Sequence, residues 1–167
     1  MLKAEDLIAA LQLQPLPREG GYYRETYRSR DLLPANVLPS RYQTDKAIST
    51  AIFYLLTPDT FSALHRLPTD EIYHFYLGSP VQMLQLGPDD RGRMVTLGTD
   101  VVTGQSPQVV VPHGVWQGSW LLPGGAFALL GTTMAPGYDF ADYEAGQSED
   151  LVERYPDHAD AIRRLCP

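Results

Sequence analysis

Short runs of β-branched and aromatic residues alternate with turn residues along most of the chain after Gly20-Gly21. Proline, glycine and aspartate mark the turns, as in Pro58-Asp59 and Pro123-Gly-Gly125. The predicted strands are 22–28, 49–56, 61–65, 71–77, 81–86, 93–97, 108–112, 116–122 and 127–134. Many short strands at this spacing predict an all-β fold, a sandwich or a barrel, over about residues 20–135.

Helical patterns flank the predicted strands on both sides. Residues 3–13 carry an apolar face of leucine and isoleucine, which predicts a packing helix. A second helical region is predicted over about 147–165, with Ser148 as its N-cap. We expect these helices to cover the outside of the strands, within a single domain of residues 1–167.

One long segment, residues 29–47, has no clear period and contains two prolines. It predicts a long loop between two strands. Loops of that length in a compact domain often serve as lids or as partner contacts.

The composition predicts a soluble protein of the cytoplasm. Cys166 is the one cysteine, so no disulfide within the chain is possible and a thiolate zinc site is not expected. No run approaches 18 apolar residues, and the first 20 residues do not resemble a signal peptide, so we expect no membrane association. The net charge of -7 repels polyanions, so nucleic acid is not an expected partner.

Two motifs carry the candidate chemistry. In the first, His65 precedes Glu71 by six residues at a strand-turn-strand boundary, and Gly78 follows seven residues later. In the second, Pro112-x-Gly114 forms a turn that leads to Gln117. Small β-barrels collect metal ligands or acid-base groups in their interior with such motifs.

These motifs resemble the two that mark the cupin superfamily, Gly-x5-His-x-His-x3/4-Glu-x6-Gly and Gly-x5-Pro-x-Gly-x2-His-x3-Asn. Two metal ligands of the superfamily pattern are replaced here. Leu67 stands where the second histidine is expected, and Gln117 stands where the last histidine is expected.

The whole chain is similar to one small cupin family, the fifth-numbered cupin domain, long described as a domain of unknown function. Four stretches carry this resemblance: Gly20–Tyr27, Asp70–Tyr76, Val111–Gln117 and Ala135–Glu144. The resemblance implies an all-β cupin jelly-roll β-barrel with short flanking helices, a homodimer and a conical pocket open at one end. It implies no settled reaction.

Ligand counting argues against a tightly held metal. His65 and Glu71 fall short of the three or four ligands that hold zinc or iron, and the neutral amide of Gln117 is a weak ligand. Strand alternation places His74 on the face opposite Glu71, where it cannot compensate. We expect no cofactor, although weak divalent metal binding, and a metal-dependent enzyme that uses His65, Glu71 and Gln117, remain alternatives.

The same side chains support proton transfer without a metal. A neutral His65 acts as the base in this hypothesis, Glu71 orients its ring, and Tyr73 or Tyr54 acts as the acid. This resembles cupins that epimerise keto-deoxy-sugar nucleotides through a histidine and a tyrosine. The predicted function is therefore isomerisation or epimerisation of a small sugar-like or carbonyl-containing molecule.

Three further residues are candidates for binding that molecule. Gln117 follows the second motif, Phe61 shares strand parity with His65, and Arg24 anchors an anionic group if its face of the strand is interior. A buried Arg24 is also compatible with a purely structural pair, for example with Glu71. A binding or sensing module without turnover is the alternative from another functional class, since pocket polarity alone accounts for the same residues.

Overall fold

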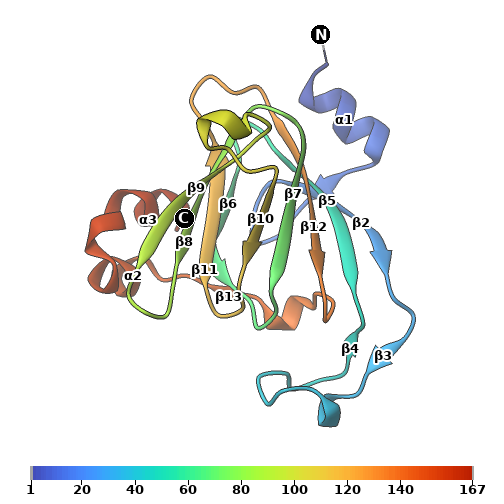
Figure 1. Cartoon of the computed structure of the whole chain (residues 1–167). Helices are drawn as coiled ribbons and strands as arrows, with labels where there is room; N and C mark the ends of the chain where they lie inside the picture. The colour runs from blue at the N-terminus through green and yellow to red at the C-terminus, as the bar shows by residue number, and fades with distance from the viewer. Residues whose placement is uncertain (1, 167) are drawn as a thin grey trace.

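The protein is a jelly roll of two facing antiparallel sheets in the computed structural model, which describes residues 2–166 (Figure 1). The six-stranded sheet has the spatial order β1 (Gln14–Pro15), β2 (Tyr22–Arg28), β5 (Thr50–Leu56), β12 (Ala128–Met134), β7 (Glu71–Gly78), β10 (Gln108–Val111). The five-stranded sheet has the order β13 (Glu144–Ala145), β6 (Phe61–Arg66), β11 (Trp116–Leu121), β8 (Val81–Leu86), β9 (Gly92–Leu97). The predicted all-β jelly-roll fold is confirmed.

Helices pack against both sheets: in Figure 1 the N-terminal helix lies at the upper end of the six-stranded sheet, and the two C-terminal helices lie beside the five-stranded sheet. Helix α1 (Ala4–Leu11) packs Leu7 against Leu55 and Leu129 of the six-stranded sheet. Helices α2 (Ser148–Arg154) and α3 (Ala159–Leu165), joined by the 3-10 turn η4 (Pro156–His158), pack on the five-stranded sheet. Within residues 2–166, no helix is long and apolar enough to cross a membrane.

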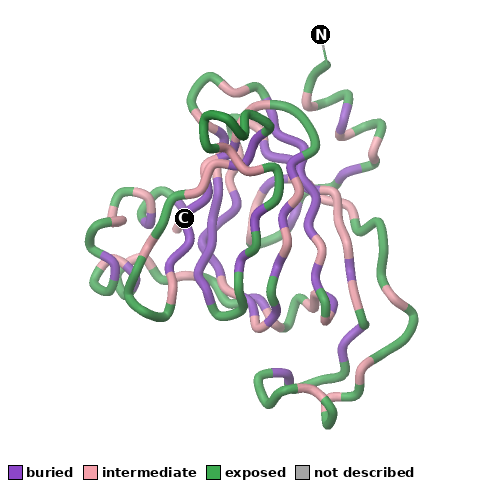
Figure 2. Tube along the Cα trace, in the orientation of Figure 1, coloured by how far each residue is buried: buried purple, intermediate pink, exposed green. Residues whose placement is uncertain are grey.

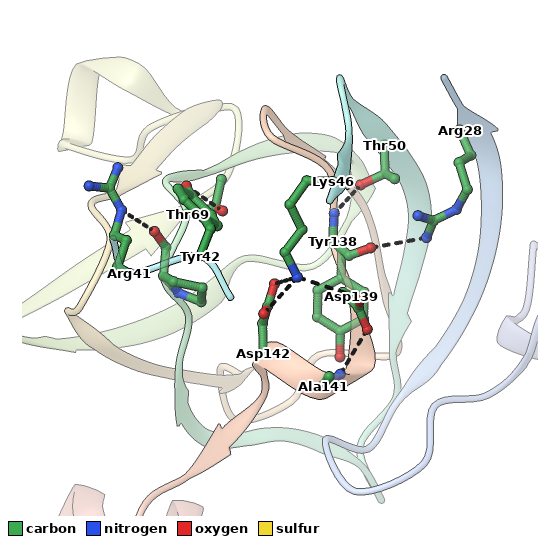
Figure 3. Close-up of polar contacts among 11 residues, drawn as sticks. Arg28, Arg41, Tyr42, Lys46, Thr50, Thr69, Tyr138, Asp139, Ala141 and Asp142 are labelled. Atoms are coloured by element: carbon green, nitrogen blue, oxygen red, sulfur yellow. Dashed lines mark hydrogen bonds and ion pairs between the residues drawn. The ribbon is translucent and has the colours of Figure 1, made fainter. Parts of the chain in front are cut away.

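The segment predicted as a loop, residues 29–47, contains the short hairpin strands β3 (Leu32–Leu33) and β4 (Lys46–Ala47), with the 3-10 turn η1 (Ala35–Val37) between them. Its far end is held to the turn between β6 and β7. Arg41 donates a hydrogen bond of 2.8 Å to the Pro68 carbonyl, and the hydroxyls of Tyr42 and Thr69 lie 2.9 Å apart (Figure 3). The segment is therefore anchored below the sheets.

The interior between the sheets changes character along the strands. At one end the inward side chains are apolar and almost fully buried, as at Val81, Leu97 and Leu130. At the other end, where the 3-10 turn η3 (Phe140–Asp142) lies, the inward positions include Glu71 and Gln117, both also buried. The buried trace between the sheets in Figure 2 therefore includes both an apolar core and a polar site.

Candidate functional site

A cavity of about 300 Å³ lies at the polar end of the jelly roll. Its wall is aromatic and acidic. The rings are those of Tyr23, Tyr54, Tyr73, Tyr138 and Phe140, the carboxylates are those of Glu19, Glu25 and Glu71, and Arg28 contributes the one cationic side chain of the lining. Concave sites with apolar walls and a few convergent polar groups are typical of small-molecule binding.

Glu71, the first residue of β7, is fixed by a neighbour from the opposite sheet. The Gln117 side-chain amide on β11 donates a hydrogen bond of 2.6 Å to Glu71 Oε2. Burial raises the pKa of the Glu71 carboxyl, the nearby charge of Glu19 raises it further, and hydrogen bonds from Thr132 and Gln117 offset part of the rise. The two cupin-like motifs thus meet at this carboxylate, as the sequence predicted.

Glu19 is the site residue that the sequence analysis missed. It lies in the loop before β2, where Arg18, Gly20 and Gly21 have positive φ angles of 69°, 93° and 71°. A Cβ at Gly21 would lie 2.8 Å from the Tyr54 hydroxyl, so this close approach requires glycine. The sequence signal was a carboxylate directly before a Gly-Gly turn that opens a strand.

Burial makes the Glu19 carboxyl a weak acid. Ser62 of β6 donates a hydrogen bond of 2.8 Å to Glu19 Oε1, and the Tyr54 hydroxyl donates to the Gly20 carbonyl beside it. Burial raises the pKa of Glu19 to about 7, although the Ser62 hydrogen bond acts in the opposite direction. Near neutral pH this carboxyl is therefore close to half protonated, next to a second buried carboxyl.

His65 lies behind the carboxylates and outside the cavity lining. Its Nδ1 is 2.8 Å from the Ala63 carbonyl, which makes Nδ1 the protonated nitrogen and leaves Nε2 as the acceptor, 3.9 Å from Glu19 Oε2. Its ring stacks on Tyr143 at 5.0 Å, and burial lowers the pKa of the imidazole. His65 therefore adjoins Glu19 outside the lining, whereas Glu19 and Glu71 line the cavity, and the catalytic role of His65 stays a prediction.

The two candidate tyrosines both line the cavity. Tyr54 and Tyr73 are each only 1% exposed. Burial raises the pKa of both phenols well above the ordinary range, and the neighbouring carboxylates add to the effect. Both therefore keep their protons and act as hydrogen-bond donors near neutral pH.

Arg24 and Phe61 do not line the cavity. Two β-bulges, one on β2 and one on β6, determine which side chains of these strands face it. On β2 the inward positions are Tyr23 and Glu25, so Arg24 points outward, with its guanidinium 5.6 Å from the Phe53 ring. A register shift between Glu25 and Tyr27 then brings Arg28 to the cavity.

The second bulge lies where β6 pairs with β11. The register there shifts between the Gln117–His65 and Ser119–Ser62 pairs, so parity is not preserved from His65 back to Phe61. Phe61 instead packs in the cluster under α2 and α3. Its predicted role in the pocket wall is therefore wrong.

Ion pairs and backbone contacts hold the cavity mouth. Figure 3 shows the contact of Arg28 with Tyr138 and those of Lys46 with Asp139 and Asp142. Arg28 binds both carboxylate oxygens of Glu25, at 2.9 and 2.7 Å, and also donates to the Tyr138 carbonyl. The almost fully buried Lys46 contacts Asp142 at 2.8 Å and Asp139 at 3.5 Å. These contacts fix the segment that carries Tyr138 and Phe140 over the cavity.

The donor set does not fit the metal site that a cupin fold implies. Leu67, in place of a histidine ligand, is buried against Met134 and Tyr143. Gln117 directs its amide nitrogen, which cannot bind a cation, to Glu71. Among residues 2–166, no three His, Cys, Asp or Glu side chains converge as metal ligands.

The chain is similar over most of its length to several other proteins. An uncharacterized protein of Saccharomyces cerevisiae, YML079W, is 33% identical over 144 residues, which cover 81% of this chain and 72% of that protein. The crystal structure of protein SO0799 from Shewanella oneidensis matches with a TM-score of 0.86 and 32% identity, covering 100% of this chain and 99% of that one. A hypothetical protein from Leishmania major matches with the same TM-score and 31% identity, covering 99% of each chain.

A more distant structural match confirms the fold alone. Oxalate decarboxylase of Bacillus subtilis aligns with a TM-score of 0.54 and 13% identity, over 93% of this chain and 38% of that one. That enzyme has Mn(II) centres. A family model described as "Cupin superfamily (DUF985)" matches residues 5–146, and the chain therefore belongs to the DUF985 family of the cupin superfamily.

Proposed function

We propose that the protein binds a small polar organic molecule in this cavity and moves a proton on it by side-chain chemistry, as an isomerase or epimerase of a sugar-like or carbonyl-containing compound. One observation carries this proposal. Glu19 and Glu71 face the same aromatic-walled cavity, and burial raises the pKa of both carboxyl groups. Two coupled carboxyl groups of this kind favour one ionised base and one protonated acid.

The roles follow from the contacts of each carboxyl group. Glu71 is the base, because it accepts a hydrogen bond from Gln117, which favours its ionised form. Glu19 is the acid, because its pKa is raised to about 7. The C–H proton next to a carbonyl passes to Glu71, and the electron pair of that bond moves onto the carbonyl oxygen. As the pair returns to the same carbon, Glu19 gives its proton to that carbon, which completes the epimerisation.

The remaining residues position these two groups. Neutral His65 lies with Nε2 3.9 Å from Glu19 Oε2, outside the lining, so its role in this scheme is indirect. Tyr73 retains its proton and can donate a hydrogen bond to a substrate oxygen, while the Tyr54 hydroxyl donates to the Gly20 carbonyl.

Proton transfer is tested by following exchange of substrate C–H groups with deuterated water. Hydroxy-carbonyl compounds and keto sugars are incubated with the protein in D2O, and loss of the C–H signal is followed by NMR. We expect exchange with at least one compound, reduced about 100- to 10,000-fold in Glu71→Gln. The matched control Glu144→Gln alters an exposed carboxylate on β13 and should exchange at the unaltered rate.

The second candidate function is binding or sensing without turnover. It is favoured by the burial of His65 outside the cavity lining, which keeps the base predicted from the sequence out of direct contact with a ligand. A compound that raises the melting temperature, yet exchanges no C–H proton even at saturating concentration, supports this function and contradicts the isomerase.

A further inference from the structure

We propose that the ligand of the cavity is a small organic cation, a hydroxyl- or carbonyl-bearing compound with a protonated amino group, and that phosphorylated and carboxylated compounds are excluded. This inference deepens the proposed function and rests on the same cavity. It concerns what binds there, so it can stand or fall separately from proton transfer.

The charges of the lining are the first argument. Glu19, Glu25 and Glu71 are opposed by one cation, Arg28, which is itself bound through two hydrogen bonds to Glu25. Glu19 and Glu71 therefore face the cavity without a cationic partner in its lining. An entering phosphate or carboxylate would meet like charge in a desolvated space, whereas an ammonium group would meet opposite charge.

The unmet hydrogen-bonding capacity is the second argument. Gln117 gives its amide nitrogen to Glu71, and its buried Oε1 has no partner among residues 2–166. Gln117 lies outside the lining, so the acceptors that the cavity itself presents are the carboxylate oxygens of Glu19 and Glu71, beside the protonated hydroxyl of Tyr73. A protonated amine supplies two or three donors, while a phosphate or carboxylate brings further acceptors.

The aromatic wall is the third argument. Five rings surround the space between the carboxylates and the mouth, including the buried pair Tyr54 and Tyr73. The faces of aromatic rings attract organic cations, and the attraction grows when water is excluded. Carboxylates and aromatic rings together select a cationic amine over a neutral compound of the same shape.

Cation binding should release a proton from Glu19. The titratable groups that face it are His65 on β6, Glu71 and Tyr73 on β7, Tyr54 on β5, and Tyr138 and Tyr143 on the segment after β12. Arg18, the nearest cation on its own loop, stacks on Tyr143 and donates to that residue's carbonyl. A bound ammonium would favour the ionised carboxylate, so the proton that Glu19 holds below pH 7 would leave.

Matched ligands test the charge preference without requiring turnover. In each of three carbon frameworks, a linear polyol, a cyclohexanol and a benzyl alcohol, the alcohol is compared with its primary amine and its phosphate by isothermal titration calorimetry. The linear series is sorbitol, 1-amino-1-deoxysorbitol and sorbitol 6-phosphate. We expect the amine to bind at least about tenfold more tightly than the alcohol in one framework or more, and the phosphate to bind most weakly in all.

Proton release from Glu19 on amine binding is a second, independent measurement. Titrations with the preferred amine at pH 6.5, in two buffers of different ionisation enthalpy, should show release of up to one proton, and release should vanish by pH 8.5. Glu19→Gln should abolish the release and weaken amine binding about tenfold or more, whereas Glu144→Gln should change neither. If Glu19→Gln does not fold, Glu71→Gln serves for the affinity measurement.

The outcomes separate this proposal from the proposed function. Equal or tighter binding of the alcohol or phosphate in every framework overturns the cation proposal, as does failure of every amine to bind. Amine binding without deuterium exchange leaves the cation proposal in place and contradicts the isomerase. Deuterium exchange on neutral carbonyl compounds, with no amine binding, supports the isomerase and contradicts the cation proposal.

Discussion

The two ends of the same strands serve different purposes. On β12 the inward residue Leu130 is completely buried in the apolar core, while Thr132, two residues on, lines the cavity. On β7 the order is reversed along the chain, from Glu71 in the cavity to Phe75 in the core. β12 and β7 pair through both ends, with one register shift between Leu129 and Leu130, so the difference between the ends lies mainly in the side chains.

The two ends also contribute to the free energy of folding in opposite directions. The apolar end removes hydrocarbon from water, which is the main favourable contribution to folding. The cavity end buries Glu19 and Glu71 with their pKa values raised, so their ionisation opposes folding. Functional sites commonly hold such unfavourable groups because the surrounding structure supports them. Mutations at the two ends should therefore act on stability with opposite signs.

The largest effect is expected at the apolar end. Leu130→Ala removes a completely buried side chain between β5 and β7 and should cost about 2–5 kcal/mol of unfolding free energy. Urea unfolding followed by circular dichroism measures this loss. The control Leu32→Ala alters a leucine that is 60% exposed on β3 and should cost much less. Similar costs for the two variants would remove the contrast.

At the cavity end, a substitution should raise the unfolding free energy, and the gain should depend on pH. The pKa of Glu19 is raised from 4.5 to about 7, so the folded protein holds this proton more firmly than the unfolded chain does. Its contribution to stability is complete below pH 4.5 and is lost as pH rises through 7, by about 3 kcal/mol. Glu19→Gln should therefore be more stable than the unaltered protein at pH 8.

The measurement is the difference in unfolding free energy between the two proteins from pH 5 to pH 8.5, with denaturant melts at each pH. The difference isolates Glu19 from His65, whose lowered pKa acts in the opposite direction because its stabilising contribution is lost on acidification. A difference that does not change with pH would show that the Glu19 carboxyl is not desolvated.

A smaller effect is expected at the cavity mouth. Lys46 is 2% exposed and contacts Asp142, which is 16% exposed, at 2.8 Å. Asp142→Asn leaves the buried ammonium with Asp139 at 3.5 Å, and should cost about 1–3 kcal/mol because an ion whose partner is removed keeps its desolvation penalty. Lys46→Met with Asp142→Asn should cost less than the sum of the single variants. If the cost of the double variant equals the sum of the two single costs, Lys46 and Asp142 do not stabilise each other.

The sequence predicted the fold and much of the site because both follow from local patterns. Strand alternation and turn residues located the strands, and the two motifs identified His65, Glu71 and Gln117, which the structure brings together through the β6–β11 pairing and the Gln117–Glu71 hydrogen bond. These motifs depend on short spacings along the chain. The catalytic and binding roles assigned to these residues stay predictions.

What the sequence did not predict depends on contacts between distant segments. Glu19 reaches the site because positive φ angles in its loop direct it towards Ser62, which lies 43 residues later. The bulges on β2 and β6 each shift the strand register by one residue. The bulge on β6 reversed the side of the strand inferred for Phe61. A bulge leaves no reliable mark on an alternating pattern, so only the fold reveals it.

The smallest loss of stability is expected at the surface ion pair Arg66–Glu144, although its hydrogen-bond geometry is better than that of Lys46–Asp142. Arg66 donates to both carboxylate oxygens of Glu144, at 2.6 and 2.7 Å, yet their side chains are 38% and 53% exposed. Glu144→Ala should cost below about 1 kcal/mol, because water and salt screen this pair and Arg66 keeps its contact with the Trp116 ring. Denaturant melts at low and high salt measure it. A loss as large as that of Asp142→Asn would mean that burial does not govern the strength of ion pairs in this protein.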